Sequence, residues 1–169
     1  MSRVAPVPIA QLNPKLAEKI DAGLSSRLLS SALPVQVWAH REEAACSWLD
    51  LLAVLHNNSL LEGRLRELIR LKIASITQCK ACQIARKSDE VDEVDVACLS
   101  YQDDRFSPQE QAALHYAELF AGDYMAIDDA IYDQLYQYFS VSQVVELNMY
   151  CALMLAGGRM TYVQQAYEA

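Results

Sequence analysis

One stretch most constrains the fold of this chain, and it reads Arg64-Leu-Arg-Glu67-Leu-Ile-Arg-Leu-Lys-Ile-Ala-Ser-Ile-Thr-Gln-Cys79-Lys-Ala-Cys82-Gln-Ile-Ala-Arg86. Its first part places apolar residues on one face of a helix, and its second part is a C-x-x-C expected at a helix start. Cysteines at this spacing lie one helical turn apart, so their sulfurs can close a disulfide. The positive end of a helix favours the thiolate, which attacks peroxides and disulfides. The pattern therefore indicates a redox site at Cys79 and Cys82.

Helical signals continue on both sides of this stretch, and no alternation with period two persists. Ser107 and Glu110 form a capping box with Pro108 at the first helical position. Ser75 and Thr77 are candidate N-caps for the cysteine helix. The sequence thus predicts an all-α chain with helices at about 14–29, 39–56, 61–76, 79–90, 92–100, 108–121, 129–138 and 141–156, the last ended by Gly157-Gly158.

Composition sets limits on organisation and function. A chain of 169 residues suits a single domain, 1–169, with a short N-terminal arm at 1–12. The net charge of −8 gives no electrostatic support for binding nucleic acid or an anionic membrane. No run reaches the roughly 18 apolar residues of a membrane span, and the start lacks a signal-peptide core. We therefore expect a cytoplasmic protein in a reducing compartment, where C-x-x-C is more often catalytic or metal-binding than a permanent crosslink.

The alternative of a zinc site has little support. Zinc usually takes four ligands, and the sequence has neither a second C-x-x-C nor an H-x₃-H. We therefore expect no metal and no bound cofactor. The other cysteines, Cys46, Cys98 and Cys151, lie in apolar helical surroundings and are expected in the core. The three histidines are scattered, and His115 is expected to have a structural role.

Spacing suggests which residues surround the cysteines. If the chain turns near Ile76, the flanking helices can pack as an antiparallel hairpin. Glu67 then lies nine residues before the turn and Arg86 ten after it, at similar height. Cys82 and Arg86 are separated by four residues and share a helix face. We therefore expect Glu67, Cys82 and Arg86 to meet in one site, although Glu67 alone would read as a surface charge paired with Arg64 or Arg70.

The order Glu67, eleven residues, then Cys79-x-x-Cys82 resembles the signature of the AhpD-like alkylhydroperoxidases of the carboxymuconolactone decarboxylase superfamily. Flanking segments extend the resemblance over roughly two thirds of the chain. The resemblance implies a multihelical AhpD-like fold of antiparallel helical hairpins. It also implies a homo-oligomer, as a dimer, trimer or hexamer.

The resemblance further implies an alkyl hydroperoxide reductase of peroxiredoxin type that uses a redox-active Cys79–Cys82 disulfide. The helix dipole and exposure favour Cys79 as the nucleophile, whereas the resemblance implies that Cys82, the deeper thiol, attacks the peroxide, and we follow the resemblance. Cys79 would then resolve the sulfenic acid and meet a dithiol electron donor. Glu67 would act as base in a proton relay. The relay histidine of the family corresponds to Arg86, and a second histidine corresponds to Ala81. An imidazole passes protons near neutral pH and a guanidinium does not, but Arg86 could hold the Cys82 thiolate by charge.

Two alternatives stay open from the sequence. A lyase of the carboxymuconolactone decarboxylase kind would use His, Arg and Glu and would not need a C-x-x-C. A non-catalytic helical oligomer could retain a vestigial site after loss of the relay histidine. Retention of both cysteines favours the leading hypothesis, a thiol-dependent oxidoreductase that reduces hydroperoxides or disulfides.

Overall fold

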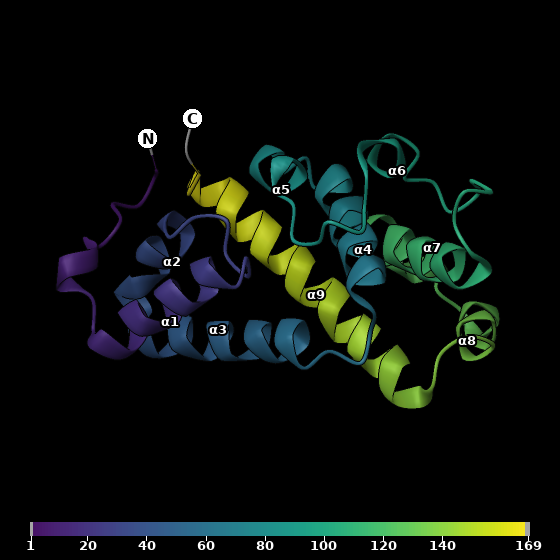
Figure 1. Cartoon of the computed structure of the whole chain (residues 1–169), viewed down its shortest axis with the longest axis horizontal. Coiled ribbons are helices and arrows are strands. Elements are labelled where there is room, and N and C mark those ends of the chain that lie inside the picture. The colour runs from purple at the N-terminus through teal and green to yellow at the C-terminus, as the bar shows by residue number, and fades with distance from the viewer. Residues whose placement is uncertain (1, 168–169) are drawn as a thin grey trace. The chain divides into compact units, whose positions relative to one another are not determined.

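The computed structural model describes residues 2–167, apart from the side chains of residues 80 and 81 (Figure 1). All regular structure in this range is helical, which confirms the all-α prediction. The chain forms two compact units. One comprises the residues up to Ser59 together with those from Arg159 onward, and the other is Leu60–Gly158. The expectation of a single domain stays a prediction.

The first unit contains the N-terminal helices. These are the 3₁₀ turn η1 (Ile9–Gln11), α1 (Pro14–Ser25), α2 (Leu33–Trp38), the 3₁₀ turn η2 (Ala39–Arg41) and α3 (Glu42–Asn57). The Asn13 side chain caps α1, and Pro14 occupies its first position, as the Asn-Pro pair predicts. Buried apolar side chains join the helices in one core, which consists of Leu12, Leu16, Ile20, Val35, Ala39, Ala45 and Leu49.

The second unit carries the cysteines. Its helices are α4 (Gly63–Ile76), α5 (Lys80–Ile84), α6 (Glu93–Ala97), α7 (Pro108–Gly122), the 3₁₀ turn η3 (Tyr124–Ala126), α8 (Asp129–Tyr136) and most of α9 (Val141–Gln164). Helices α4 and α7 pack side by side. One hydrophobic cluster of this unit consists of Leu68, Leu71, Val91, Phe106 and Leu114. The predicted capping box of Ser107 and Glu110 is present at the start of α7.

Arg64 ties three helices of this unit together. Its guanidinium donates to Asp95 of α6 at 2.7 Å, to Glu110 of α7 at 2.8 Å and to the carbonyl of Glu90 at 2.6 Å. The hydrogen bond from Arg64 is the main reason that the pKa of the Asp95 carboxyl lies below its usual range. Arg64 thus fixes α4 against the segment that follows the cysteines.

Several helix boundaries differ from the sequence expectation: α1 ends at Ser25 and not near residue 29, and α2 lies in a stretch for which no helix was expected. The cysteine helix, expected to reach about residue 90, ends at Ile84. Ser75 and Thr77 do not cap it, because their hydroxyls donate back to the carbonyls of Lys72 and Ile73 in α4. Ser and Thr hydroxyls bond readily to the preceding helical turn, so these residues complete α4 instead of starting α5.

The last helix also differs, because α9 runs through Gly157-Gly158 to Gln164. A glycine ends a helix when it takes a left-handed φ, and no described glycine has one. A Cβ atom at Gly158 would lie 3.4 Å from Thr77 Oγ1, an ordinary contact distance, so α9 lies next to the end of α4 at this point.

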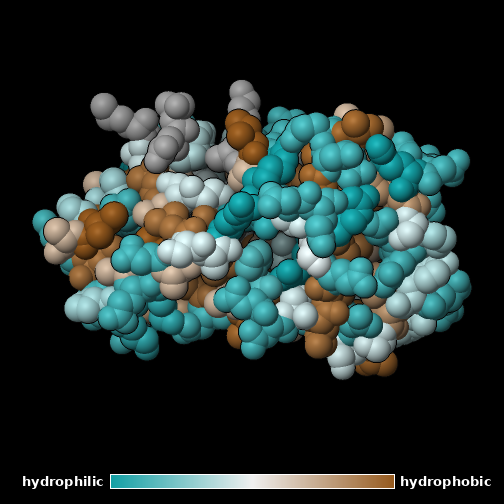
Figure 2. Space-filling view, viewed as in Figure 1, coloured by the Kyte–Doolittle hydropathy of each residue, from teal (hydrophilic) through white to brown (hydrophobic). Residues whose placement is uncertain are grey.

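The surface is mixed in character. On the face in Figure 2, hydrophilic residues predominate and hydrophobic residues lie in several separate groups. Over the described residues, every helix is too short or too polar to cross a membrane.

Candidate functional site

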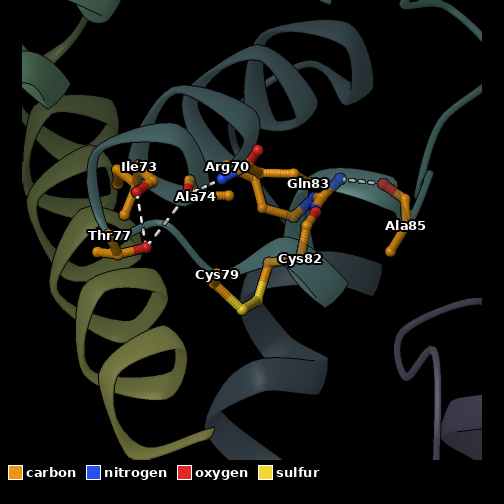
Figure 3. The surroundings of a disulfide bond; sticks show 8 residues. All are labelled: Arg70, Ile73, Ala74, Thr77, Cys79, Cys82, Gln83 and Ala85. Atoms are coloured by element: carbon orange, nitrogen blue, oxygen red, sulfur yellow. Dashed lines mark hydrogen bonds between the residues drawn. A yellow bond between two sulfur atoms is a disulfide. The ribbon is translucent and has the colours of Figure 1, made fainter. Parts of the chain in front are cut away.

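A disulfide joins Cys79 and Cys82, whose Cα atoms are 5.2 Å apart (Figure 3). The turn that brings them into place closes α4 with a Schellman motif. Cys79 N donates to Ala74 O at 3.2 Å, and Gln78 N donates to Ser75 O at 3.3 Å. Gln78 takes the left-handed conformation that this motif requires, with φ of 53°. Glycine usually occupies this position, so the sequence lacks the usual signal for the turn.

The two cysteines differ in exposure. Cys79 is 2% exposed, whereas Cys82 is half-buried. The expectation that Cys82 would be the deeper thiol is therefore wrong. Cys79 is the last residue of the turn that closes α4, and its N–H is bound to Ala74 of that helix. Cys82 lies on the short helix α5. Solvent access therefore favours Cys82 as the sulfur that meets another molecule.

Glu67 lies in the interior of the unit and not on its surface. It is 2% exposed, and both of its carboxylate oxygens accept hydrogen bonds from Arg70, at 2.7 and 2.8 Å. The same Arg70 donates to the carbonyls of Cys82 and Ala85, each at 2.6 Å. Figure 3 shows Arg70 reaching from α4 to Ala85, while Gln83 bonds back to Ala74. Arg70 thus holds α5 and the chain after it against the buried carboxylate.

Arg86 does not pair with Glu67, and the expected arrangement of these two residues is wrong. The Arg86 guanidinium donates to Glu93 of α6 at 2.9 and 3.0 Å and to the carbonyl of Gln83 at 2.5 Å. The expectation assumed one helix running through Cys82 and Arg86. Because α5 ends at Ile84, the four-residue spacing no longer places the two side chains on one helix face. Arg70 has the position beside Glu67 that was expected for Arg86.

Lys87 is the residue that sequence reasoning missed. Its backbone N–H donates to Glu67 Oε1 at 2.9 Å. The Lys87 pKa is lowered to about 8, mainly by burial of its side chain and also by the positive charge of Arg70, whereas the negative charge of Glu67 raises it. Nothing in the sequence indicates this, because a lysine among polar residues after a short helix normally lies in solvent.

Tyr150 of α9 belongs to the same surroundings. It is buried, and the charges of Arg70 and Glu67 both act on its hydroxyl. Burial is the main reason that its pKa is raised, so the phenol stays neutral over the physiological range. Arg70 thus binds Glu67 and the Cys82 carbonyl, Glu67 binds the Lys87 N–H, and both charges act on Tyr150; we call these four residues the charged cluster.

The remaining cysteines have different environments. Cys151 is buried, which raises the pKa of its thiol, as a core residue requires. Cys46 and Cys98 are only half-buried, so the expectation of three core cysteines is correct for Cys151 alone. His115 stacks on Tyr101 with ring centroids 4.1 Å apart, in keeping with a structural role.

Cys98 lines an open cavity of about 540 Å³ that the sequence did not predict. The cavity wall includes Gln83, next to Cys82, but neither cysteine of the disulfide. The rest of the wall is formed by Leu71, Ser75, Val96, Ala97, Leu99, Ser100 and Asp103. Within the described part of the chain, no three His, Cys, Asp or Glu residues are grouped as metal ligands would be.

Solved structures resemble this chain over 76% to 99% of its length. The debrominase Bmp8 matches with a TM-score of 0.82 at 18% identity, covering 98% of this chain and 91% of that one. An AhpD-core, peroxidase-related protein from Ralstonia eutropha matches with a TM-score of 0.73 at 18% identity, covering 99% and 92%. A protein of unknown function from Agrobacterium tumefaciens, named as a candidate antioxidant defence protein AhpD, matches with a TM-score of 0.67 at 20% identity, covering 76% and 92%.

No model of a protein family and no curated protein matches the sequence. The structural matches are all below 25% identity, so they establish the fold. They agree with the resemblance of the Glu67 and C-x-x-C pattern to the AhpD-like proteins. The chain therefore has an AhpD-like, all-α fold.

Proposed function

We propose that this protein is a thiol-dependent oxidoreductase in which Cys79 and Cys82 cycle between a dithiol and a disulfide. Its substrates would be hydroperoxides or disulfides, and an external dithiol would return the electrons. The observation that carries the proposal is the Cys79–Cys82 disulfide, held by Arg70 beside the buried Glu67 in an AhpD-like fold.

The difference in exposure supports an order of events. The Cys82 thiolate attacks the terminal oxygen of a hydroperoxide; an S–O bond forms, the O–O bond breaks, and the departing alkoxide takes a proton. The Cys79 thiolate then attacks the resulting sulfenic acid, so that an S–S bond forms and the hydroxyl leaves with a proton as water. With Cys79 2% exposed, the donor dithiol attacks the sulfur of Cys82 and not that of Cys79.

The structural similarity to Bmp8 suggests a second class of electron acceptor, the brominated arenes. That protein is a debrominase, and its cysteine-to-alanine variant has been solved with 2,3,4-tribromopyrrole. The same dithiol could supply two electrons to a carbon–bromine bond. One bromoarene and two thiols would give the debrominated arene, hydrogen bromide and the disulfide. Bromopyrroles therefore belong among the acceptors to be tested.

The test combines redox titration with turnover. The protein is equilibrated with dithiothreitol buffers, and its disulfides are mapped by peptide mass spectrometry. Reduction of tert-butyl hydroperoxide, a small disulfide and tribromopyrrole is then followed with dithiothreitol as donor. We expect Cys82→Ser to abolish turnover and Cys79→Ser to slow it, because dithiothreitol must then reduce the Cys82 sulfenic acid directly. Cys46→Ser, distant in sequence and in the other unit, is the control and should behave as wild type.

Two outcomes would contradict the proposal. One is a disulfide between Cys82 and Cys46, Cys98 or Cys151 in the oxidised protein. The other is the failure of all three acceptors to react with the reduced protein, which would favour a vestigial site.

A further inference from the structure

The open cavity of about 540 Å³ is formed by residues of α4, α5 and α6 and of the loop that follows α6. No residue of the charged cluster is in its wall, and neither cysteine of the disulfide is. A volume of this size is typical of sites for small organic molecules. The cavity is therefore a candidate binding site separate from the redox pair.

The apolar part of the wall is continuous with a hydrophobic cluster of the unit. Leu71 is 1% exposed and belongs to that cluster, and Val96 and Leu99 pack against it. Close-packed side chains of this kind keep one position, so the cavity has a preformed apolar surface. An apolar ring or chain is the part of a ligand that this surface would cover.

Gln83 and Asp103 supply hydrogen-bond acceptors to the wall. Gln83 Nε2 donates to Ala74 O at 3.1 Å, which leaves the carboxamide oxygen of Gln83 without a donor among the described residues. Asp103 Oδ1 accepts from the N–H of Arg105 at 3.0 Å, and no described residue donates to Oδ2. A ligand with an O–H or N–H would satisfy these oxygens.

The charge of the wall restricts the ligand further. The described wall contains the carboxylate of Asp103 and no lysine, arginine or histidine. The ammonium of Lys72, next to Leu71 in the chain, is bonded to the carbonyl of Leu99 at 2.9 Å and to Glu118. A carboxylate or phosphate in the cavity would lose its water without gaining a cation, so the wall disfavours an anionic ligand.

Two polar residues of the wall are bonded to the turn that carries the disulfide. The carbonyl oxygen of Ala74 accepts both from Gln83 Nε2 and from the Cys79 N–H, the latter at 3.2 Å. The carbonyl of Ser75 accepts from the N–H of Gln78 at 3.3 Å. A ligand in the cavity would therefore lie against residues that hold the cysteine segment to α4.

We propose that this cavity binds a small organic molecule without negative charge, which donates an O–H or N–H to Gln83 or Asp103. Its apolar ring or chain lies against Leu71, Val96 and Leu99. Phenols and N–H heterocycles belong to this class of ligand, and carboxylated rings do not. The site follows from the cavity and its wall and does not depend on the redox chemistry of the disulfide.

The first test uses Cys98, which is half-buried and part of the wall, as a reporter. The oxidised protein is alkylated with N-ethylmaleimide at increasing concentrations of 2-naphthol, and each cysteine is followed by peptide mass spectrometry. At about ten times the dissociation constant of 2-naphthol, we expect alkylation of Cys98 to slow roughly tenfold, because the occupied cavity does not react. Cys46, half-buried in the other unit, is the internal control and should react at an unchanged rate.

An unchanged rate for Cys98 up to the solubility limit of 2-naphthol would overturn the proposal. Equal slowing of Cys98 and Cys46 would also overturn it, because the effect would then lie in the reagent and not in the cavity.

The second test compares ligands and variants by isothermal titration calorimetry. 2-Naphthoate has the same rings with a carboxylate in place of the hydroxyl, and we expect it to bind at least about tenfold more weakly than 2-naphthol. Ala97→Trp places an indole in the cavity from an exposed position of the wall and should weaken 2-naphthol binding about tenfold or more. Val94→Trp is the control, because Val94 is exposed on the same helix outside the wall, and it should match the parent.

These outcomes separate the two proposals. Equal affinity for 2-naphthol and 2-naphthoate, or unchanged binding to Ala97→Trp, would overturn the proposed site, even if the disulfide cycles with substrate. Absence of turnover with every acceptor would overturn the proposed function, even if 2-naphthol protects Cys98.

Discussion

The ion pair of Glu67 and Arg70 gains its importance from burial. A salt bridge between exposed residues on a helix contributes about 0.3–0.5 kcal/mol. Removing one partner of a buried pair costs about 3–5 kcal/mol, because an uncompensated charge remains in the interior. Glu67 and Arg70 are 2% and 7% exposed, and Arg70 also satisfies two backbone carbonyls of the cysteine segment. Arg70 therefore contributes both to the stability of the unit and to the position of Cys82.

We expect Arg70→Met to lower the free energy of unfolding by about 3–5 kcal/mol, since Glu67 would be left buried without its partner. Urea denaturation of the oxidised protein measures this loss. Arg86→Met is the matched control, because Arg86 pairs with an exposed carboxylate, and it should cost at most about 1 kcal/mol. Equal losses in the two variants would show that the Arg70 pair has no special weight.

At the scale of elements, the turn between α4 and α5 places the disulfide. The Schellman hydrogen bonds of this turn end α4 at Ile76 and bind the Cys79 N–H to the last turn of α4. The left-handed residue in this turn is Gln78, for which the conformation is unfavourable by roughly 1 kcal/mol relative to glycine. The backbone of Gln78, next to Cys79, is therefore slightly strained.

We expect Gln78→Gly to stabilise the protein by up to about 1 kcal/mol, because glycine adopts the left-handed conformation without a Cβ clash. Thermal unfolding of the oxidised protein measures the effect. Gln78→Ala is the control and should give no such gain, because alanine keeps the Cβ. A gain of the same size in Gln78→Ala would show that the Gln78 side chain, and not its backbone conformation, is unfavourable.

At the scale of the whole molecule, the expected homo-oligomer depends on exposed apolar surface. Helix α9 exposes Val141, Val145 and Met149, which follow one another at four-residue spacing on one face. A row of exposed apolar side chains on a helix is suited to packing against another protein surface. We propose that this face takes part in self-association of the chain.

Light scattering at micromolar concentration should therefore return a mass above that of the monomer, and Val145→Glu should reduce it by placing a charge in the contact. Val54→Glu on α3 is the control, because Val54 is equally exposed at 55% and lies on the other unit. Monomer mass in the unmodified protein would contradict the oligomer. The same reduction in both variants would exclude a specific role for the α9 face.

The sequence by itself determined the helical class, several helix starts and the cysteine pair. Such features depend on local physics: a proline after Asn13 or Ser107, a capping box, and the apolar periodicity of α4 act over one or two turns. The C-x-x-C likewise carries its own geometry, since three residues bring two sulfurs within bonding distance.

Only the tertiary structure decided which charges surround the cysteines. Whether Glu67 pairs with Arg70 or Arg86 depends on where α5 ends. The position of α5 depends on the left-handed Gln78 in the turn before it and on the hydrogen bonds from Arg70 to two carbonyls. The low pKa of Lys87 depends mainly on burial of its side chain in the folded unit. Local patterns hold no information about such burial, because desolvation is a property of packed elements and not of sequence spacing.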